Sequence, residues 1–556
     1  MHPRADLNHA PTWLSRHPRL IALFPFLLYA LLVVPAVWVR RNQINPDAIC
    51  YIRLSTYLLR RDWRHAISGY WSPLFPWCMS PFLAMGLDGL HAAHVTLALI
   101  GGLYLFAARR LLRRFESLNS RMVFWMMMIF AVIAVRLVVR IISPDLLMAA
   151  LLLFYLAQMH RRDLLQRLRA PFVAGLLGGM LYLAKAYAFP FFLAHFPLTL
   201  LLRWWLERRA VDPGNRPRFT WLFAAIASGL AGCALIAFPW IMLLSHSYGR
   251  LTISTAGPFN HNEARSAPEA YKYRFSYFVP PDPYLLESEI IDRRVHRFWS
   301  PFDSREQLNR QWRIVKENLP DILATLGTFD RIWLVPLSLV IASAIGIRML
   351  LRRQDRHSGI AWEIPWLAMT MLIYCSGFTL VYFEPRLIAV ALRLPAMLLC
   401  ILLTIHLIAR MRRLNRAIVV WIVLGVFAIS ACIDLAGAYA NTSRDDLPRA
   451  VADAMRSAGL RGPLAGSSRG FGGYVAYFLD AKLITLPTDE SSEELERHCD
   501  QANVRCVLIH MDIVKGHVAS PVPLTPIMQM VQHRRWIPRL TIADPHLRID
   551  VYERMR

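Results

Sequence analysis

Five charged residues interrupt the apolar segments of this sequence, and their types could act together on a phosphate ester. The acids are Asp47, Asp145 and Glu384, and the cations are Lys185 and Arg386. A carboxylate can take a proton from a hydroxyl group, and a lysine or arginine can stabilise the negative charge of a departing phosphate. Each residue also has an ordinary structural interpretation, so the elements that position it must be considered.

Asp47 lies in the segment INPDAICYIRLSTYLLRRDWRHAISGYWSPLFPW, residues 44–77, which is too charged to cross a bilayer. Asn45 can cap a helix and Pro46 suits its first position, so Asp47 falls in the first turn, where the helix dipole favours an anion. Downstream, Arg53 stands among apolar residues, which predicts a helix along the membrane interface with its arginines toward phosphates. The spacing leaves open that Asp47 only stabilises the start of this helix.

The second acid follows a pair of arginines. The segment VRLVVRIISPDLLMAALL places Arg136 and Arg140 four residues apart on one helix face, and Asp145 after Pro144. Charges within a membrane are costly and tend to face a cavity or a partner. An equally good interpretation is that the arginines extend to the membrane interface and that Asp145 begins the next helix.

The remaining candidates lie between later apolar segments. Lys185, in LYLAKAYAFPFF, is the only lysine of the apolar portion in a chain that otherwise uses arginine almost everywhere. A compact ammonium group at the edge of the bilayer suits a lipid phosphate. The segment VYFEPRLIAVALRLP puts Glu384 and Arg386 in a tight turn, where a mutual surface ion pair is the alternative interpretation.

The composition indicates an integral membrane protein. Hydrophobic residues make up 56% of the 556 residues, and several apolar runs approach the roughly 20 residues that span a bilayer. The net charge of +25 is compatible with nucleic acid, but the arginines cluster at the ends of apolar runs, as membrane orientation requires, so we expect no nucleic-acid partner. The eleven predicted spans are residues 20–39, 89–108, 122–141, 143–158, 170–184, 186–202, 219–244, 330–350, 361–382, 386–409 and 417–438.

Short connections rich in arginine set the predicted orientation. They are residues 109–121, 159–169, 203–218, 348–360 and 410–416, and all are cytoplasmic if the N-terminus is cytoplasmic. The loops at 40–88 and 245–329 and the C-terminal region then lie on the opposite side of the cytoplasmic (inner) membrane. The five charged residues fall on that same side, at one depth of the bilayer.

Residues 440–556 alternate helix-like and strand-like patterns. This predicts a small extracytoplasmic α/β domain that follows a transmembrane domain at 1–439. The stretch GSSRGFGG, residues 466–473, follows a predicted strand as phosphate-binding loops do. It lacks the full GxGxxG spacing, however, and a tight turn is the better interpretation.

The cysteine and histidine residues offer possible disulfides and one possible metal site. Oxidising surroundings permit a Cys499–Cys506 or a Cys50–Cys78 disulfide. A metal site would be compatible with the group His246, His261 and Glu263, although histidines in surface loops are far more often unligated.

The order of these segments resembles the GT-C superfamily of integral-membrane glycosyltransferases, especially the bacterial branch of protein O-mannosyltransferases and aminoarabinose transferases. The matching pieces are NPDAICYIRLSTYLLRRDWRHAISGYWSPLFPW, SPDLLMAALLL, YLAKAYAFPFF, YFEPRLIAVALRLP and GGYVAYFLDAKLITLP. The resemblance implies a polyprenyl-phosphate-linked sugar donor, transfer outside the cytoplasmic membrane, and the family's two loop acids at Asp47 and Asp145. The family often has an acidic pair in the first loop, whereas Ala48 follows Asp47 here, so we expect neither a metal nor another cofactor.

A mechanism follows from these residue types. We expect Asp47 to act as the base, with Asp145 as the second catalytic acid, and an inverting single displacement. Lys185, Arg386 and Glu384, with Arg140 and Arg53, are the candidate residues for binding the lipid phosphate and sugar.

The acceptor class (protein, lipid or polysaccharide) is open at this stage. Besides the donor and the acceptor, we expect membrane lipids as partners. Two other classes of function remain. The first is a transporter or flippase for a lipid-linked sugar, although no internal repeat is found. The second is a non-catalytic envelope assembly protein.

Overall fold

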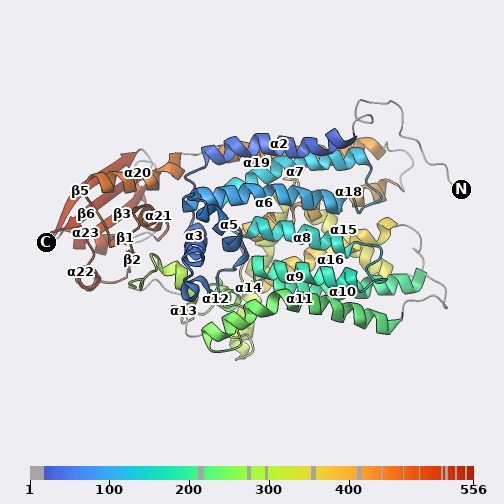
Figure 1. Cartoon of the computed structure of the whole chain (residues 1–556), viewed down its shortest axis with the longest axis horizontal. Coiled ribbons are helices and arrows are strands. Elements are labelled where there is room, and N and C mark those ends of the chain that lie inside the picture. The colour runs from blue at the N-terminus through green and yellow to red at the C-terminus, as the bar shows by residue number, and fades with distance from the viewer. Residues whose placement is uncertain are drawn as a thin grey trace.

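Long apolar helices, arranged side by side, make up most of the structure (Figure 1). The computed structural model describes residues 18–210, 218–271, 277–294, 298–351, 359–409, 416–439, 443–466, 469–487, 489–514, 517–519, 524–532, 535–544 and 547–555. Parts of the predicted cytoplasmic connections at 203–218, 348–360 and 410–416 lie outside these residues.

Among the described residues, eleven helices form the bundle, and each overlaps one predicted apolar segment. They are α2 (Pro18–Val39), α6 (Gly89–Leu112), α7 (Ser120–Arg140), α8 (Asp145–Met159), α9 (Arg169–Ala184), α10 (Ala188–Ala210), α11 (Phe219–Tyr248), α15 (Leu334–Leu351), α16 (Gly359–Leu380), α18 (Arg393–Ile408) and α19 (Arg416–Tyr439). In the described part of the chain, six helices are long and apolar enough to cross a membrane, namely those in α2, α6, α7, α10, α11 and α19. The protein is therefore a multi-pass membrane protein, and the count of eleven crossings stays a prediction.

Helices α9 and α11 pack closely because both carry glycine at the contact. A Cβ atom added to Gly175 would come within 1.8 Å of the Gly229 carbonyl oxygen, and one added to Gly232 within 2.3 Å of the Phe172 carbonyl oxygen. Small residues let helix backbones approach in this way within membranes. Large apolar side chains on the outer faces, such as Leu31 and Leu235, are exposed, as contact with lipid requires.

A layer of shorter elements covers one end of the bundle, which we call the domain end because the C-terminal sheet adjoins it. The layer contains α3 (Pro46–Leu59), α4 (Trp63–Ala66), α5 (Leu74–Ala84), α12 (Ala256–Asn262), η2 (Glu287–Ile290), α13 (Ile291–Arg294), α14 (Arg305–Gly327) and α17 (Pro385–Ala389). Figure 1 shows α3 lying across the bundle axis, between the bundle and the sheet. Most of its side chains from Ala48 to Tyr57 are buried. Protein therefore covers α3 on both sides. The position of α3 across the end of the bundle agrees with the predicted interfacial helix, and its depth in the membrane stays a prediction.

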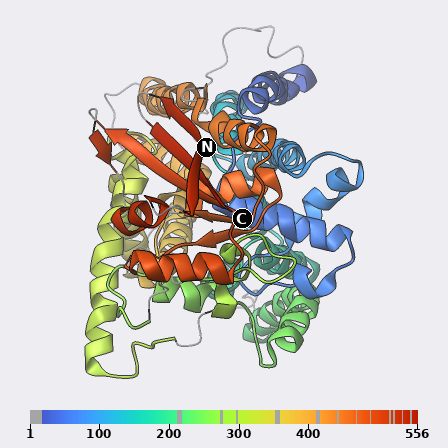
Figure 2. The ribbon, with the colours of Figure 1, turned by 90° about the vertical axis from the view of Figure 1, so that its left-hand side faces the viewer.

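The C-terminal region, residues 443–555, contains a mixed sheet. Its elements are α20 (Ser443–Ser457), β1 (Leu464–Gly466), α21 (Arg469–Leu479), β2 (Leu483–Thr485), α22 (Ser492–Gln501), β3 (Cys506–Val514), β4 (His517–Ala519), α23 (Thr525–Gln532), β5 (Trp536–Asp544) and β6 (Leu547–Arg554). The strand order is β2-β1-β3-β6-β5, with β4 paired to β3. Strand β1 is parallel to β2 and β3, whereas β6 is antiparallel to β3 and β5. Figure 2, viewed from this end, shows the sheet in front of the bundle.

Cys499 and Cys506 do not form the disulfide that the sequence permits. Cys499 is free and packs in the core between the sheet and α22 and α23, with its Sγ 4.0 Å from Met530 Sδ. Cys506 is free and belongs to the core that is continuous with the bundle. Cys50 and Cys78 are free as well, so neither of the two possible pairings is present.

One loop joins the C-terminal region to the covering layer. Phe278 forms a β-bridge with Thr485, and the Leu483 amide donates to the Leu285 carbonyl oxygen over 3.0 Å. Lys482 also pairs with Asp282 over 2.5 Å. We call residues 277–294 the connecting loop, because its other side contacts α3.

Candidate active site

Arg386 joins two of the three predicted acids at the domain end of the bundle. Its Nη1 donates to Asp47 Oδ2 over 2.6 Å, and its Nε donates to Glu384 Oε2 over 2.5 Å. Pro385 occupies the first turn of α17, and Glu384 is the extended residue before it, so the tight turn places Glu384 beside Arg386. The ion pair between Glu384 and Arg386 is therefore present, and Arg386 also contacts Asp47 in the first turn of α3.

Asp145 and Lys185 form a second pair beside the first. Lys185 Nζ pairs with Asp145 Oδ1, and Ser143 Oγ donates to Asp145 Oδ2 over 2.9 Å. Lys185 is the extended residue that ends α9. The charge of Asp145 also acts on Arg386 and on Asp47. All five predicted residues therefore form one group of three carboxylates and two cations.

Asn45 connects the two acid-bearing segments. The sequence predicts a capping role, but its side chain makes no capping hydrogen bond to α3. Instead its Nδ2 donates to the Ile142 carbonyl oxygen over 3.2 Å, and the Ile142 amide donates to its Oδ1 over 2.9 Å. These two bonds hold the start of α3 against the turn that carries Asp145.

The two acids differ in access and in electrostatic environment. The Asp145 side chain is 3% exposed and both its oxygens are engaged, whereas the Asp47 side chain is 22% exposed. No described residue donates a hydrogen bond to Asp47 Oδ1, which leaves an acceptor for a ligand. Burial raises the pKa of Asp47 above its usual value, although Arg386 opposes this rise. A raised pKa makes a carboxylate a better proton acceptor.

Four tyrosines surround this group, and the sequence analysis missed them. Tyr382 donates to Glu384 Oε1 over 3.0 Å, and burial followed by the Glu384 charge raises its pKa to about 12. Tyr51 and Tyr70 lie within electrostatic reach of Asp47. Aromatic residues are common throughout this chain, so no local signal distinguishes these four.

The fourth tyrosine, Tyr474, comes from the C-terminal region. It lies on α21, which packs against α3. Burial, and then the Asp47 carboxylate, raises its pKa to about 12. The C-terminal region thus places a tyrosine within electrostatic reach of the carboxylate that Arg386 contacts.

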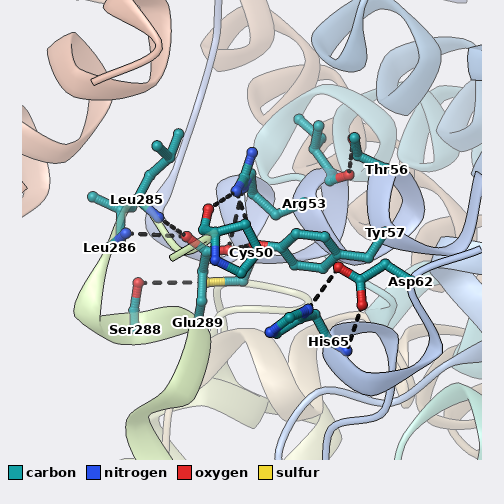
Figure 3. A network of polar contacts seen from close by, with 12 residues as sticks. Cys50, Arg53, Thr56, Tyr57, Asp62, His65, Leu285, Leu286, Ser288 and Glu289 are labelled. Carbon is teal, nitrogen blue, oxygen red and sulfur yellow. Dashed lines mark hydrogen bonds and ion pairs between the residues drawn. The ribbon is translucent and has the colours of Figure 1, made fainter. Parts of the chain in front are cut away.

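Arg53 lies with a different partner. Its Nε donates to Glu289 Oε2 over 3.2 Å, and Tyr57 donates to the same oxygen over 2.7 Å (Figure 3). Glu289 Oε1 accepts the amides of Leu285 and Leu286 over 2.7 and 3.0 Å. This buried network fastens the connecting loop to α3, so Arg53 holds the helix that carries Asp47 and does not reach toward lipid phosphate.

Arg140 also lies apart from the five-residue group. It is exposed at the end of α7, where its charge acts on Arg136 and Arg393. Nor do the histidines gather for a metal. His261 Nε2 contacts Gln311 Oε1 at 2.8 Å and its ring stacks on Trp299. Among the described residues, no three His, Cys, Asp or Glu side chains gather in the way that a metal ion requires.

The fold of this chain also occurs in solved structures. The chain is structurally similar, over nearly its whole length, to the GT-C glycosyltransferases ArnT and AglB. No protein-family model and no curated protein sequence matches the chain.

We compare the chain with two of these solved structures. The first is ArnT from Cupriavidus metallidurans bound to undecaprenyl phosphate, with a TM-score of 0.50 and 12% identity, covering 97% of this chain and 98% of that one. The second is the oligosaccharyltransferase AglB from Archaeoglobus fulgidus in complex with an inhibitory peptide and a dolichol-phosphate. Its TM-score is 0.50 with 12% identity, and the match covers 90% of this chain and 70% of that one. At this identity the comparison establishes the fold.

Proposed function

We propose that this protein is a membrane glycosyltransferase that moves a sugar from a polyprenyl-phosphate donor to an acceptor hydroxyl group. The observation that carries the proposal is the meeting of Asp47, Asp145, Lys185 and Arg386 at one end of a bundle with the GT-C fold. These residues come from separate turns, and their side chains are the acids and cations that the reaction needs. The site would lie outside the cytoplasmic membrane, together with the C-terminal region.

In the proposed reaction Asp47 is the general base. The acceptor oxygen attacks the anomeric carbon while its proton passes to the Asp47 carboxylate. The bond between the anomeric carbon and the phosphate oxygen breaks at the same time, and the electron pair leaves with the polyprenyl phosphate. One displacement inverts the anomeric centre. Asp145, with both oxygens engaged, positions Lys185 and does not accept the proton.

Lys185 and Arg386 would bind the phosphate of the donor. Their side chains are 22% and 21% exposed, so each retains donors that a ligand can reach. Charge-assisted hydrogen bonds from such groups to phosphate are strong, and they strengthen as the leaving oxygen gains charge. Glu384, bonded to Arg386 Nε, fixes the orientation of the guanidinium plane.

The test is a transfer assay with the full chain purified in nanodiscs. The donors are radiolabelled polyprenyl-phosphate sugars, and the acceptors are membrane lipid, peptide and polysaccharide fractions. Transfer of label that releases free polyprenyl phosphate is the expected result. Movement of intact donor between leaflets of proteoliposomes, without transfer, would identify a flippase instead. The absence of both transfer and movement would indicate an assembly protein. Mass spectrometry of polyprenyl-phosphate sugars that accumulate in a deletion strain identifies the donor to use.

A further inference from the structure

A second group of charges lies at the domain end of the bundle, and we call it the arginine cluster. It consists of Arg136 on α7, Arg140 at the end of α7, Arg331 before α15, Arg393 at the start of α18, and Asp434 on α19. Asp434 Oδ1 accepts from Arg331 over 3.1 Å, and its Oδ2 accepts from Arg393 over 2.8 Å. Arg136 donates to the Gly437 carbonyl oxygen over 3.2 Å.

The cluster carries more positive charge than its own carboxylate can balance. It has four arginines and one aspartate, and Arg331 and Arg393 already occupy both oxygens of Asp434. Neither Arg136 nor Arg140 forms an ion pair with a carboxylate from the described part of the chain, although the charge of Asp434 reaches Arg136. The charge of Arg140 acts on both Arg136 and Arg393. The group around Asp47 has the opposite balance, with three carboxylates and two cations. Crowded like charges at a partly buried site are costly unless an anion compensates them.

Buried polar atoms around Arg393 lack partners. The Arg393 side chain is 9% exposed, and its Nε makes no hydrogen bond within the described residues. The Tyr104 hydroxyl, which lies within electrostatic reach of Arg393, is fully buried and likewise has no partner there. Ser430, one helical turn before Asp434, is buried with its Oγ unpaired among these residues. Buried polar groups are normally satisfied, so the unpaired Arg393 Nε and Tyr104 hydroxyl group are suited to a polar ligand at this place.

Exposed apolar side chains lie beside the residues of the cluster in the sequence. Ile332 and Trp333, which follow Arg331, are 61% and 55% exposed, and Ile429 and Ile433 on α19 are 63% and 47% exposed. Apolar and aromatic residues beside arginines are typical of the headgroup region of a bilayer. A ligand at this place would therefore have an anionic group beside an apolar body.

We propose that the arginine cluster binds the phosphate of a membrane-lipid headgroup, at a site separate from the donor site at Lys185 and Arg386. Arginine suits this ligand because its planar group binds phosphate oxygens in pairs. The ordinary alternative is that the arginines only extend to the interface, in which case no particular headgroup is bound.

Native mass spectrometry of the delipidated full chain, titrated with phosphatidylglycerol or zwitterionic phosphatidylcholine, tests the proposal. The variant Arg140→Gln/Arg331→Gln removes two exposed charges, and Arg497→Gln/Arg539→Gln removes two exposed charges from the C-terminal region as a matched control. Each arginine near a membrane surface contributes roughly a fivefold change in binding of an anionic lipid, so the cluster variant should bind phosphatidylglycerol at least tenfold more weakly. The control and all phosphatidylcholine titrations should be unchanged.

A second variant should change lipid binding in the opposite direction. Asp434→Asn removes the competing carboxylate, so phosphatidylglycerol should bind more tightly than in the wild type. Binding of labelled inorganic phosphate in detergent, weakened in the same cluster variant, would also support the phosphate site and would identify a soluble ligand as its source. Equal lipid binding by the wild type and the cluster variant overturns the proposal. So does a raised KM for the polyprenyl donor with unchanged lipid binding, because the cluster would then belong to the donor site.

Discussion

The Arg386 guanidinium group contacts the Asp47 carboxylate over 2.6 Å across 339 residues of sequence. This contact brings the turn before α18 to the first turn of α3. It also gives the exposed carboxylate a cationic neighbour within reach of a bound phosphate.

Asp47→Asn should abolish most transfer while the donor still binds. Asparagine suits a helix N-terminus, so folding should be retained, but it cannot accept the proton. Turnover should fall by roughly 10² or more, the usual scale for a lost acid–base group. Lys185→Ala should instead raise the KM for the polyprenyl donor, because a phosphate loses a cationic partner. Steady-state kinetics on both variants, with Asp453→Asn on exposed α20 as the control, separates these effects. Near-normal transfer by folded Asp47→Asn would return Asp47 to a structural role.

The pH profile should respond in opposite directions to changes at Arg386 and Glu384. Burial raises the pKa of Asp47, Arg386 lowers it, and the charge of Glu384 raises it. Activity requires ionised Asp47 and so falls as the pH falls through this pKa. Arg386→Gln should therefore move the acid limb of kcat/KM to higher pH, and Glu384→Gln should move it to lower pH. Limbs that shift in the same direction, or not at all, would assign the titration to another group.

Glu289→Gln should destabilise the fold strongly. The Arg53 and Glu289 side chains are 11% and 3% exposed, so removing one charge leaves the other buried and unpaired, at a cost of about 3–5 kcal/mol. Thermal unfolding in one detergent measures the effect, and the exposed α14 variant Glu306→Gln should cost only about 0.3–0.5 kcal/mol. The double variant Arg53→Met/Glu289→Gln should lose less stability than the sum of the single changes. Additive losses would show that the two residues do not act as a pair.

Tyr474→Phe should slow transfer although it lies in the C-terminal region. Its hydroxyl group lies within electrostatic reach of Asp47. A hydrogen bond that it donates to a charged group in the reacting complex would contribute about 1.5 kcal/mol or more, equivalent to roughly tenfold in rate. Tyr477→Phe on the same helix is the control, because the Tyr477 hydroxyl is directed toward Gly89. Equal rates for the two variants would exclude Tyr474 from the site.

Reporter fusions test the proposed orientation. Fusions after residues 115, 210 and 355 should report a cytoplasmic location, because arginine-rich connections stay on that side. Fusions after residues 285 and 500 should report an exported location. A cytoplasmic signal after residue 500 would place the C-terminal region inside and would rule out an extracytoplasmic site.

The sequence predicts the helices of the bundle well because the length of each apolar segment and the residues at its ends are local features. Apolar length fixes where α6, α7 and α11 lie, and Asn45-Pro46 fixes where α3 begins. The gathering of Asp47, Asp145 and Lys185 also follows from the ends of the apolar segments, once orientation is assigned.

Long-range partners could not be predicted in this way. Arg53 was expected to face lipid phosphate, yet Glu289 lies 236 residues away in sequence and binds it. Asn45 was expected to cap α3, but Ile142 offers two backbone groups that need partners. Such pairings depend on which loop covers which helix, and local pattern does not contain that information.

The connecting loop has a consequence for domain exchange. Glu289 holds its one side to α3, and Leu285 and Phe278 hold its other side to strand β2. In a chimera that replaces residues 443–555 alone, the backbone groups of residues 277–294 would meet the β2 strand of another protein. Their hydrogen bonds to the original β2 would be lost. Any functional transplant of the C-terminal region between related proteins must therefore carry residues 277–294 with it, although more than a hundred residues separate the two segments in the chain.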